Sequence, residues 1–118
     1  MPLASQVMAG IVALLHLYFL VLEMFLWTTP YGQATFKRTA KEQESSRVLA
    51  ANQGLYNGFL AAGLVWSMIT GDYEVRNFFF GCIVVAGVYG GATVGKQILV
   101  FQALPAVLGI VFTALSMT

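Results

Sequence analysis

The sequence carries little charge. Lys, Arg, Asp and Glu make up 9% of the 118 residues, whereas about a quarter of the residues in soluble domains are charged. Hydrophobic residues make up 58%, so the polar residues are too few to cover a water-facing surface. A net charge of +1 also excludes the basic face that nucleic-acid binding requires. We therefore expect the lipid bilayer to surround most of this protein, and we expect no nucleic-acid partner.

Cysteine and histidine are nearly absent. The single cysteine, Cys82, excludes an intramolecular disulfide, a paired-cysteine zinc site and a CxxC redox motif. The single histidine, His16, falls short of a catalytic zinc site even with a nearby carboxylate, because such sites usually take three protein ligands. No metal site is predicted.

Long apolar runs are abundant. Four segments supply the roughly 20 residues needed to cross a hydrocarbon core: residues 4–28, 48–70, 77–95 and 98–117. None of them alternates in polarity as a membrane β-strand does. No Lys or Arg precedes the first run, and it is too long for the core of a cleavable signal. The predicted fold is all-α: residues 1–118 form one domain, a polytopic antiparallel bundle of four transmembrane helices.

The basic residues predict the orientation in the membrane. Four of them lie in a basic loop at residues 31–47, and Lys96 lies in the third connection. These two connections share one side of the membrane if all four segments span, and cytoplasmic loops are enriched in Lys and Arg. We expect a multi-pass protein of the cell inner membrane with both termini on the non-cytoplasmic side.

Glycines recur at intervals of four residues. Gly54 and Gly58 do so in the second segment, and Gly87, Gly91 and Gly95 do so in the third. Small residues let helix backbones approach closely in lipid. These glycines are therefore predicted helix-packing positions, either within one chain or between the subunits of a homo-oligomer.

A proline interrupts the fourth segment. Pro105 has no backbone N–H, so we expect it to kink the helix and to free a carbonyl one turn earlier, near Phe101. Gln102 is placed either to cap this gap or to face a partner.

Two ionisable residues lie in the first segment. His16 and Glu23 are seven residues apart, nearly two helical turns, and share a face that Trp27 extends by another turn. Glu23 is the only acidic residue in any predicted span. An ionisable group inside a membrane is a functional-site hypothesis because its charge is costly in hydrocarbon. Glu23 and His16 are the candidate catalytic or proton-exchanging residues, although His16 also fits a satisfied core histidine.

The second segment contributes three carboxamides. Gln53 and Asn57 share one face, and Asn52 and Tyr56 share a neighbouring one. Carboxamides both donate and accept hydrogen bonds, so they can hold a carboxylate, an imidazole or a small polar ligand. These four residues and Trp27 are the predicted ligand-binding residues of a polar pocket between the first two helices. The alternative is that the carboxamides only join neighbouring helices.

Four stretches resemble the motif blocks of the domain of unknown function 1304 family of small bacterial integral membrane proteins. They are HLYFLVLEMFLW, VLAANQGLYNGFLAAGLVW, FFFGCIVVAGVYGGATVGK and QALPAVLG. The resemblance covers nearly the whole chain and implies four membrane helices. It implies no particular activity.

A second, partial resemblance is to the membrane-associated eicosanoid and glutathione metabolism family. An Arg entering helix two, then NGFLAAGLVWS, GK and QALP follow in that family's order. The resemblance implies four-helix trimers that use glutathione between subunits. The chain departs from that family where Gly54 occupies the position of a Glu. The basic cluster near helix four is reduced to Lys96, which leaves Arg47 and Lys96 as the main cationic candidates for the two carboxylates of glutathione.

These observations favour a small integral membrane protein with an intramembrane polar pocket for a small amphipathic ligand. Whether it is an enzyme stays open, and no cofactor is predicted apart from the glutathione of the second resemblance. Three alternatives remain: a proton- or cation-coupled small transporter acting as an oligomer, a glutathione-dependent transferase-like enzyme, and a structural membrane subunit.

Overall fold

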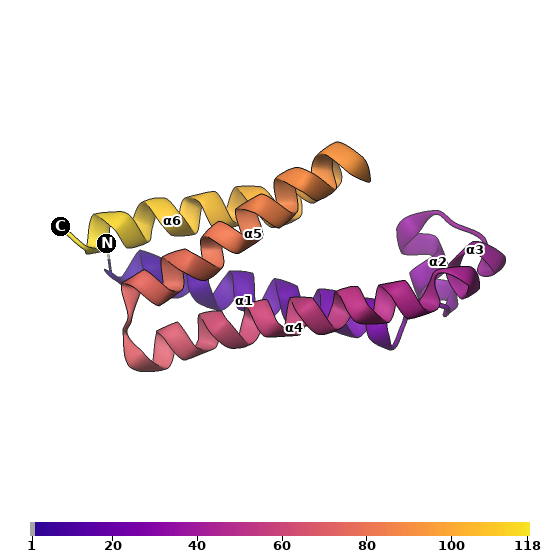
Figure 1. The fold of residues 1–118 in the computed structure, drawn as a ribbon, viewed down its shortest axis with the longest axis horizontal. Coiled ribbons are helices and arrows are strands. Elements are labelled where there is room, and N and C mark those ends of the chain that lie inside the picture. The colour runs from indigo at the N-terminus through magenta and orange to yellow at the C-terminus, as the bar shows by residue number, and fades with distance from the viewer. Residues whose placement is uncertain (1) are drawn as a thin grey trace. The chain divides into compact units, whose positions relative to one another are not determined.

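The computed structural model describes residues 2–118, which are helical and contain no β-strand. The helices are α1 Pro2–Met24, α2 Pro30–Phe36, α3 Ala40–Ser45, α4 Arg47–Thr70, α5 Tyr73–Thr93 and α6 Leu104–Ser116 (Figure 1). A π-helical segment, η1, covers Leu99–Ala103 and leads into α6. The prediction of an all-helical chain is confirmed.

Three helices are long and apolar enough to cross a membrane: α1, α5, and the continuous helix from Leu99 to Ser116. Helix α4 is as long, with 24 residues, but its carboxamides lower its mean hydropathy and it is not one of the three. The first span ends at Met24 and not at residue 28. The third begins at Tyr73 and not at residue 77, because the Asp72 carboxylate caps α5 by accepting from the Val75 N–H at 3.1 Å.

Residue contacts group the chain into two compact units. Unit 1 is the chain before residue 15 together with Leu60–Thr118, and unit 2 is Leu15–Phe59. Helices α1 and α4 contribute residues to both units. Each unit has its own packing and its own polar contacts.

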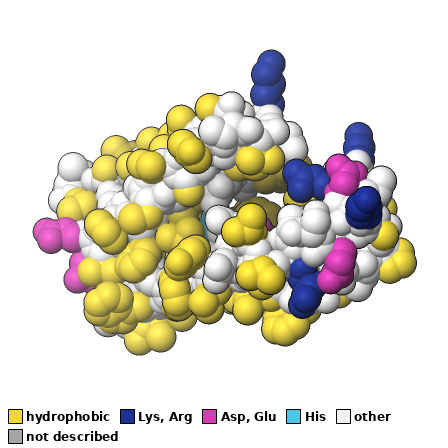
Figure 2. Space-filling model, turned by 45° about the vertical axis from the view of Figure 1, so that its right-hand side comes forward, with side chains coloured by type: hydrophobic (Ala, Val, Ile, Leu, Met, Phe, Trp, Pro, Cys, Tyr) yellow, Lys and Arg dark blue, Asp and Glu magenta, His cyan; other side chains and the backbone are white. Residues whose placement is uncertain are grey.

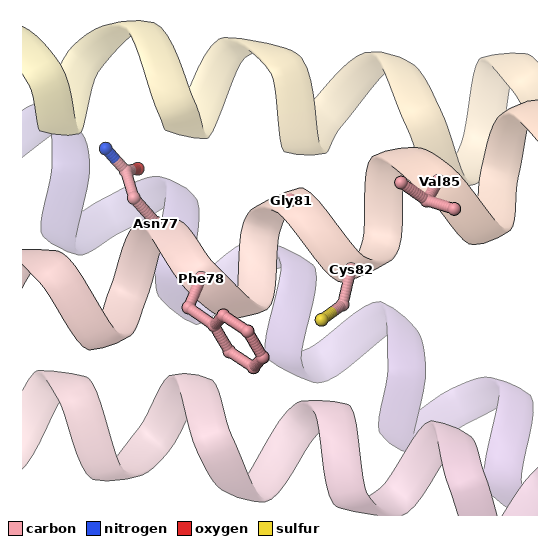
Figure 3. Close-up of a pocket in the computed structure, with 5 residues that line it drawn as sticks. All are labelled: Asn77, Phe78, Gly81, Cys82 and Val85. Carbon is pink, nitrogen blue, oxygen red and sulfur yellow. The ribbon is translucent and has the colours of Figure 1, made fainter.

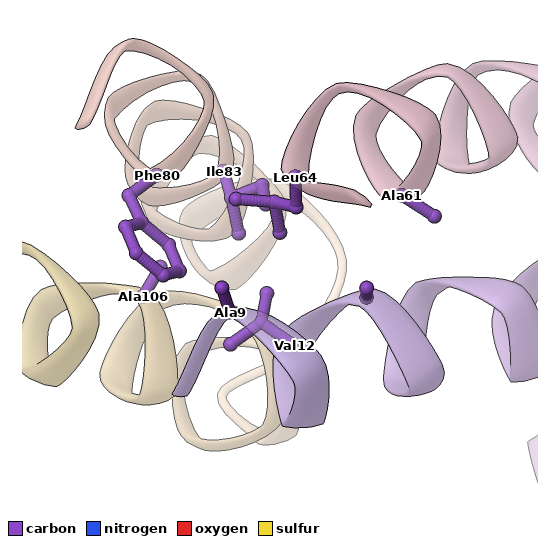
Figure 4. Close-up of a cluster of buried hydrophobic side chains, with 8 residues drawn as sticks. Ala9, Val12, Ala61, Leu64, Phe80, Ile83 and Ala106 are labelled. Carbon is purple, nitrogen blue, oxygen red and sulfur yellow. The ribbon is translucent and has the colours of Figure 1, made fainter. Parts of the chain in front are cut away.

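The core of unit 1 is built from small and branched side chains of four helices. Phe80 and Ile83 of α5 are fully buried among side chains of α1, α4 and α6 (Figure 4). The buried members are Ala9, Val12, Ala13, Ala61, Leu64, Phe80, Ile83 and Ala106. Close van der Waals contacts among these side chains hold the helices of unit 1 together.

Helices α5 and α6 lie side by side in unit 1 (Figure 1), and η1 explains how the fourth segment accommodates Pro105. The Leu104 N–H donates to the Leu99 carbonyl five residues back, which is the π-helical register. A proline in a regular α-helix clashes with the carbonyl four residues before it, here that of Phe101. The distortion predicted near Phe101 therefore takes the form of a π-helical turn.

The connection between α1 and α4, residues 25–46, is called the connector below. Where the sequence predicts a basic loop at residues 31–47, the structure has two short helices. The Thr29 side chain caps α2 by accepting from the Gly32 N–H at 3.3 Å. Thr39 and Glu42 form a capping box at α3. The Thr39 backbone N–H donates a hydrogen bond to the Glu42 carboxylate, and this bond lowers the pKa of that carboxyl. The loop prediction missed these caps because it was based on polarity alone.

The surface of the chain is largely apolar. Apolar side chains cover most of the face drawn in Figure 2. Leu3, Leu49, Ile69 and Tyr89 are each more than two-thirds exposed. Exposed apolar side chains of this kind are expected where lipid surrounds a helix.

Candidate functional site

A carboxylate and a carboxamide meet between α1 and α4 in unit 2. The Asn57 Nδ2 group donates to Glu23 Oε1 at 2.5 Å. Asn57 is 4% exposed, and its Oδ1 has no hydrogen-bond donor within reach among the described residues. Within unit 2, no Lys, Arg or His lies within ion-pair distance of Glu23. The pair thus combines an acidic group without a cationic partner and a buried carbonyl oxygen without a donor.

Two glycines bring α4 close enough to α1 for this contact. A Cβ added to Gly54 would lie 2.6 Å from Met24 Cγ and 3.2 Å from the Leu20 carbonyl oxygen. A Cβ added to Gly58 would lie 2.7 Å from Leu20 Cδ1. The predicted packing glycines of the second segment therefore face α1 within one chain, and this close approach lets the short Asn57 side chain reach Glu23.

The other predicted ligand-binding residues of α4 lie away from this pair. Asn52, Gln53 and Tyr56 are exposed, and the Tyr56 ring packs beside Phe59 with ring centroids 5.9 Å apart. Apart from Gly63, the residues of α4 that are buried recur at intervals of three and four: Ala50, Gly54, Asn57, Ala61, Leu64 and Ser67. This stripe contains one carboxamide of the three. The spacing of Gln53 and Asn57 indicates a shared face, but the face toward α1 is centred on Gly54 and Asn57.

His16 is buried but is not in contact with Glu23. Its side chain is 0% exposed, and its ring meets Phe19 edge to face with centroids 5.2 Å apart. Seven residues of helix separate it from Glu23 by about 10 Å. Its surroundings match those of a histidine in a packed core.

Trp27 anchors the connector and does not line the pair. Because α1 ends at Met24, the helical line drawn through residues 16 and 23 does not extend to residue 27. The Trp27 indole N–H donates to Ser46 Oγ at 3.1 Å, and its carbonyl accepts from Gln43 Nε2 at 2.9 Å. Its ring packs on Phe36 with centroids 4.6 Å apart. These contacts fold the connector, and the predicted ligand contact of Trp27 stays a prediction.

A second polar cluster, missed by the sequence reasoning, lies in unit 1. Arg76 of α5 is 1% exposed and donates to Ser67 Oγ at 3.1 Å, Ser5 Oγ at 2.8 Å and Gln6 Oε1 at 2.7 Å. Ser5 Oγ also shares a 2.5 Å hydrogen bond with Thr113 Oγ1. The Arg76 guanidinium of α5 therefore contacts side chains of α1 and α4, and Ser5 links this cluster to Thr113 of α6.

The partners of Arg76 are neutral. A fourth hydrogen bond runs to the Ser67 carbonyl at 3.2 Å, and the guanidinium carbon lies 5.2 Å from the centroid of the Tyr73 ring. Arg76 is not among the residues that the sequence pattern singles out for a polar site. The signal that points to this cluster is the presence of hydroxyl residues at positions 5, 67 and 113 in otherwise apolar segments.

A shallow, open depression runs along α5. Its lining comes from one helix: Asn77, Phe78, Gly81, Cys82 and Val85 (Figure 3). The free thiol of Cys82 is half-buried there. No carboxylate or histidine lines this depression.

Metal ligands are not gathered anywhere in the part of the chain that the structure describes. Among residues 2–118, no three or more His, Cys, Asp or Glu side chains are placed so that they could hold a metal ion.

Known proteins similar to this chain cover nearly all of it. Residues 10–114 match the model of the family described as "Protein of unknown function (DUF1304)". The chain is 28% identical over 115 residues to the uncharacterized protein YpaA of Lactococcus lactis subsp. lactis (strain IL1403), which covers 94% of this chain and 97% of that protein. No solved structure matches the chain. The matched region includes Glu23, Asn57 and Arg76.

Proposed function

The chain belongs to the DUF1304 family of proteins of unknown function, and from its own residues we propose that it is a polytopic membrane protein whose Glu23–Asn57 pair binds a small amphipathic ligand. The observation that carries this proposal is the buried Asn57 Oδ1 beside a carboxylate. Packing alone rarely requires a carboxylate inside a span, because its charge is costly there. Buried polar atoms usually have partners, so an open acceptor marks a place for one.

Four membrane spans are part of the proposal. Helix α4 has 24 residues, about 36 Å at the rise of an α-helix, and its only charged residue is Arg47 at its first position. Three further helices are apolar enough to span. An antiparallel order of four spans, with the connector in the cytoplasm of a bacterial cell and both termini outside, follows from the positive-inside rule.

Thiol labelling of intact cells tests this topology. In a Cys82→Ser background, which removes the single cysteine, we expect Thr118→Cys to react with a membrane-impermeant maleimide. Lys41→Cys and Lys96→Cys are expected to react only after the membrane is permeabilised. Labelling of Lys41→Cys in intact cells would contradict the orientation. Protection of Lys41→Cys with exposure of Lys96→Cys would contradict the four spans.

Ligand retention tests the site. The protein is purified from its own membrane in a mild detergent, and small molecules that stay bound are detected by native mass spectrometry. We expect the wild type to retain a small amphipathic molecule and Glu23→Gln and Asn57→Ala to lose it, because each variant removes a group that contacts it. Asn52→Ala is the matched control, since that exposed carboxamide lies on the same helix.

Two outcomes would contradict the site. In the first, the wild type retains no small molecule, although the wild type, the variants and the control all unfold at the same temperature. The other is equal retention by the wild type, Glu23→Gln and Asn57→Ala. The latter result places the bound molecule elsewhere on the chain.

A proton- or cation-coupled transporter acting as a homo-oligomer is the second candidate. The observation that favours it is that Glu23 has no cationic partner in unit 2. The Asn57 amide can donate to an ionised Glu23 or, turned by half a rotation, accept from a protonated one. In proteoliposomes, Glu23→Gln should then abolish proton-coupled flux, and unchanged flux would remove this candidate.

The two remaining alternatives have less support. Glutathione brings two carboxylates, but Arg47 already pairs with Glu44 at 3.2 Å, so one of its two expected cations is engaged. A purely structural subunit accounts for the Arg76 cluster. It does not account for the open acceptor at Asn57.

A further inference from the structure

The oxygens of the Glu23–Asn57 pair that lack a hydrogen-bond partner are all acceptors. An ionised carboxylate only accepts hydrogen bonds, and a carboxamide oxygen does the same. Asn57 uses Nδ2 to donate to Glu23 Oε1, while its Oδ1, on a side chain that is 4% exposed, has no donor within reach. A partner that satisfies this pair has to donate hydrogen bonds.

The charge of the pair is also one-sided. Within unit 2, no Lys, Arg or His lies within ion-pair distance of Glu23. The basic residues of the connector, such as Lys37, Arg38 and Lys41, are exposed and make no ion pair there. A carboxylate held between two membrane helices is stabilised by a cation close to it, and the described residues of unit 2 place none beside Glu23.

We infer that the ligand of this site carries a protonated primary amine as its head group, held by the Glu23 carboxylate and Asn57 Oδ1. This inference rests on the proposed function. An ammonium has three N–H donors and one positive charge, so it meets both requirements at once. A carboxylate head would place like charges together, and an alcohol would leave the charge of Glu23 unpaired.

The surroundings of the pair suit an apolar tail. Leu20 and Met24 lie on α1 within one turn of Glu23, and they are the side chains that a Cβ added to Gly58 or Gly54 of α4 would meet. Both are half-buried, so part of each apolar side chain remains at the surface beside the pair. An amphipathic amine can therefore place its head group at the pair while its chain remains among apolar side chains and lipid tails.

Four probes with the same chain test the head group: dodecylamine, dodecanol, dodecanoate and dodecyltrimethylammonium. Saturable binding is measured on the full chain in nanodiscs of zwitterionic lipid, relative to empty nanodiscs, which removes simple partitioning. We expect dodecylamine to bind about 10-fold to 100-fold more tightly than dodecanol or dodecanoate, the range for a hydrogen bond to a charged group. Dodecyltrimethylammonium keeps the charge but has no N–H, so it is expected to bind between these limits.

Variants locate the preference. Glu23→Gln, which keeps the size and the acceptor oxygen of the side chain, is expected to reduce amine binding to the level of the alcohol. Asn57→Leu is expected to weaken amine binding at least about 10-fold. Glu74→Gln, an exposed acidic residue at the first turn of α5, is the matched control and should leave amine binding unchanged. Unfolding temperatures of all variants verify that each one folds.

The outcomes separate the inference from the proposed function. Equal binding of amine, alcohol and carboxylate that is lost in Glu23→Gln would overturn the amine assignment and leave the site standing. Amine binding that survives in Glu23→Gln would overturn the assignment of the amine to this pair. Absence of saturable amine binding, with ligand retention by the purified wild type, would also overturn the amine assignment. If retention and binding of all four probes are absent together, both proposals fail.

Discussion

Arg76→Ala is expected to lower the free energy of unfolding by about 2–4 kcal/mol. The guanidinium makes four hydrogen bonds to residues of α1 and α4, and all of them are lost. Interhelical hydrogen bonds in membranes average only about 0.6 kcal/mol each, but those to charged donors reach about 1.5–3 kcal/mol. A cavity left among fully buried Ser5, Ser67 and Thr113 adds to the loss. The measurement is thermal or denaturant unfolding in detergent micelles.

Two other substitutions separate the charge of Arg76 from its volume. Arg76→Met fills most of the space and removes the buried charge together with its desolvation cost, so we expect a smaller loss than for alanine. Arg76→Lys keeps the charge but cannot reach several acceptors in a fixed fork, and we expect it to fall between methionine and the wild type. An equal loss for methionine and alanine would mean that the hydrogen bonds, and not the packing, hold the cluster.

Arg47→Ala is the control for this series. Arg47 and Glu44 form an exposed ion pair, with about three-fifths of each side chain accessible. Exposed pairs contribute about 0–1 kcal/mol. A loss for Arg76→Ala no larger than that for Arg47→Ala would contradict a stabilising role for the buried cluster.

The helical architecture could be predicted from the sequence because it depends on summed properties. Apolar length identifies α1, α5 and the last helix without any knowledge of contacts. The predicted ends of α1 and α5 differ from the observed ends, because the end of a helix depends on single capping residues such as Asp72. The helices of the connector were missed for the same reason, because the Thr39–Glu42 capping box was obscured by a polar, basic composition.

The candidate site could be predicted in part. Glu23 is conspicuous as the only acidic residue in an apolar run, and Asn57 was one of three carboxamides considered together. Which of the three faces α1 depends on the phase of α4, and that phase is set by where Gly54 permits close approach. The Arg76 cluster joins residues up to 108 positions apart. No local pattern encodes such a contact, and the chain has to fold before the hydroxyls at positions 5 and 67 can be recognised as its partners.

Gly87→Leu is expected to be the second large effect, lowering the free energy of unfolding by about 3 kcal/mol or more. A Cβ on Gly87 would lie 2.6 Å from the Ala103 backbone nitrogen and 2.9 Å from its Cα. These are backbone atoms of η1, whose π-helical register accommodates Pro105, so they cannot turn aside as the end of a side chain does. Even Gly87→Ala should cost about 1–3 kcal/mol.

Gly81→Ala and Gly91→Ala provide graded controls within α5. Nothing lies within 4 Å of a Cβ added to Gly81, so alanine there should be neutral or stabilising by up to about 1 kcal/mol through its higher helix propensity. At Gly91 the obstacle is the Leu99 side chain, which can change rotamer, so a smaller loss than at Gly87 is expected. Unfolding in micelles, followed with size-exclusion light scattering, distinguishes the two roles open to these glycines. If Gly87 packs α5 against η1, its variants lose stability at an unchanged oligomeric state. If it lies instead at a subunit contact, Gly87→Leu will change the oligomeric state at little cost to the stability of the chain, and the intrachain assignment fails.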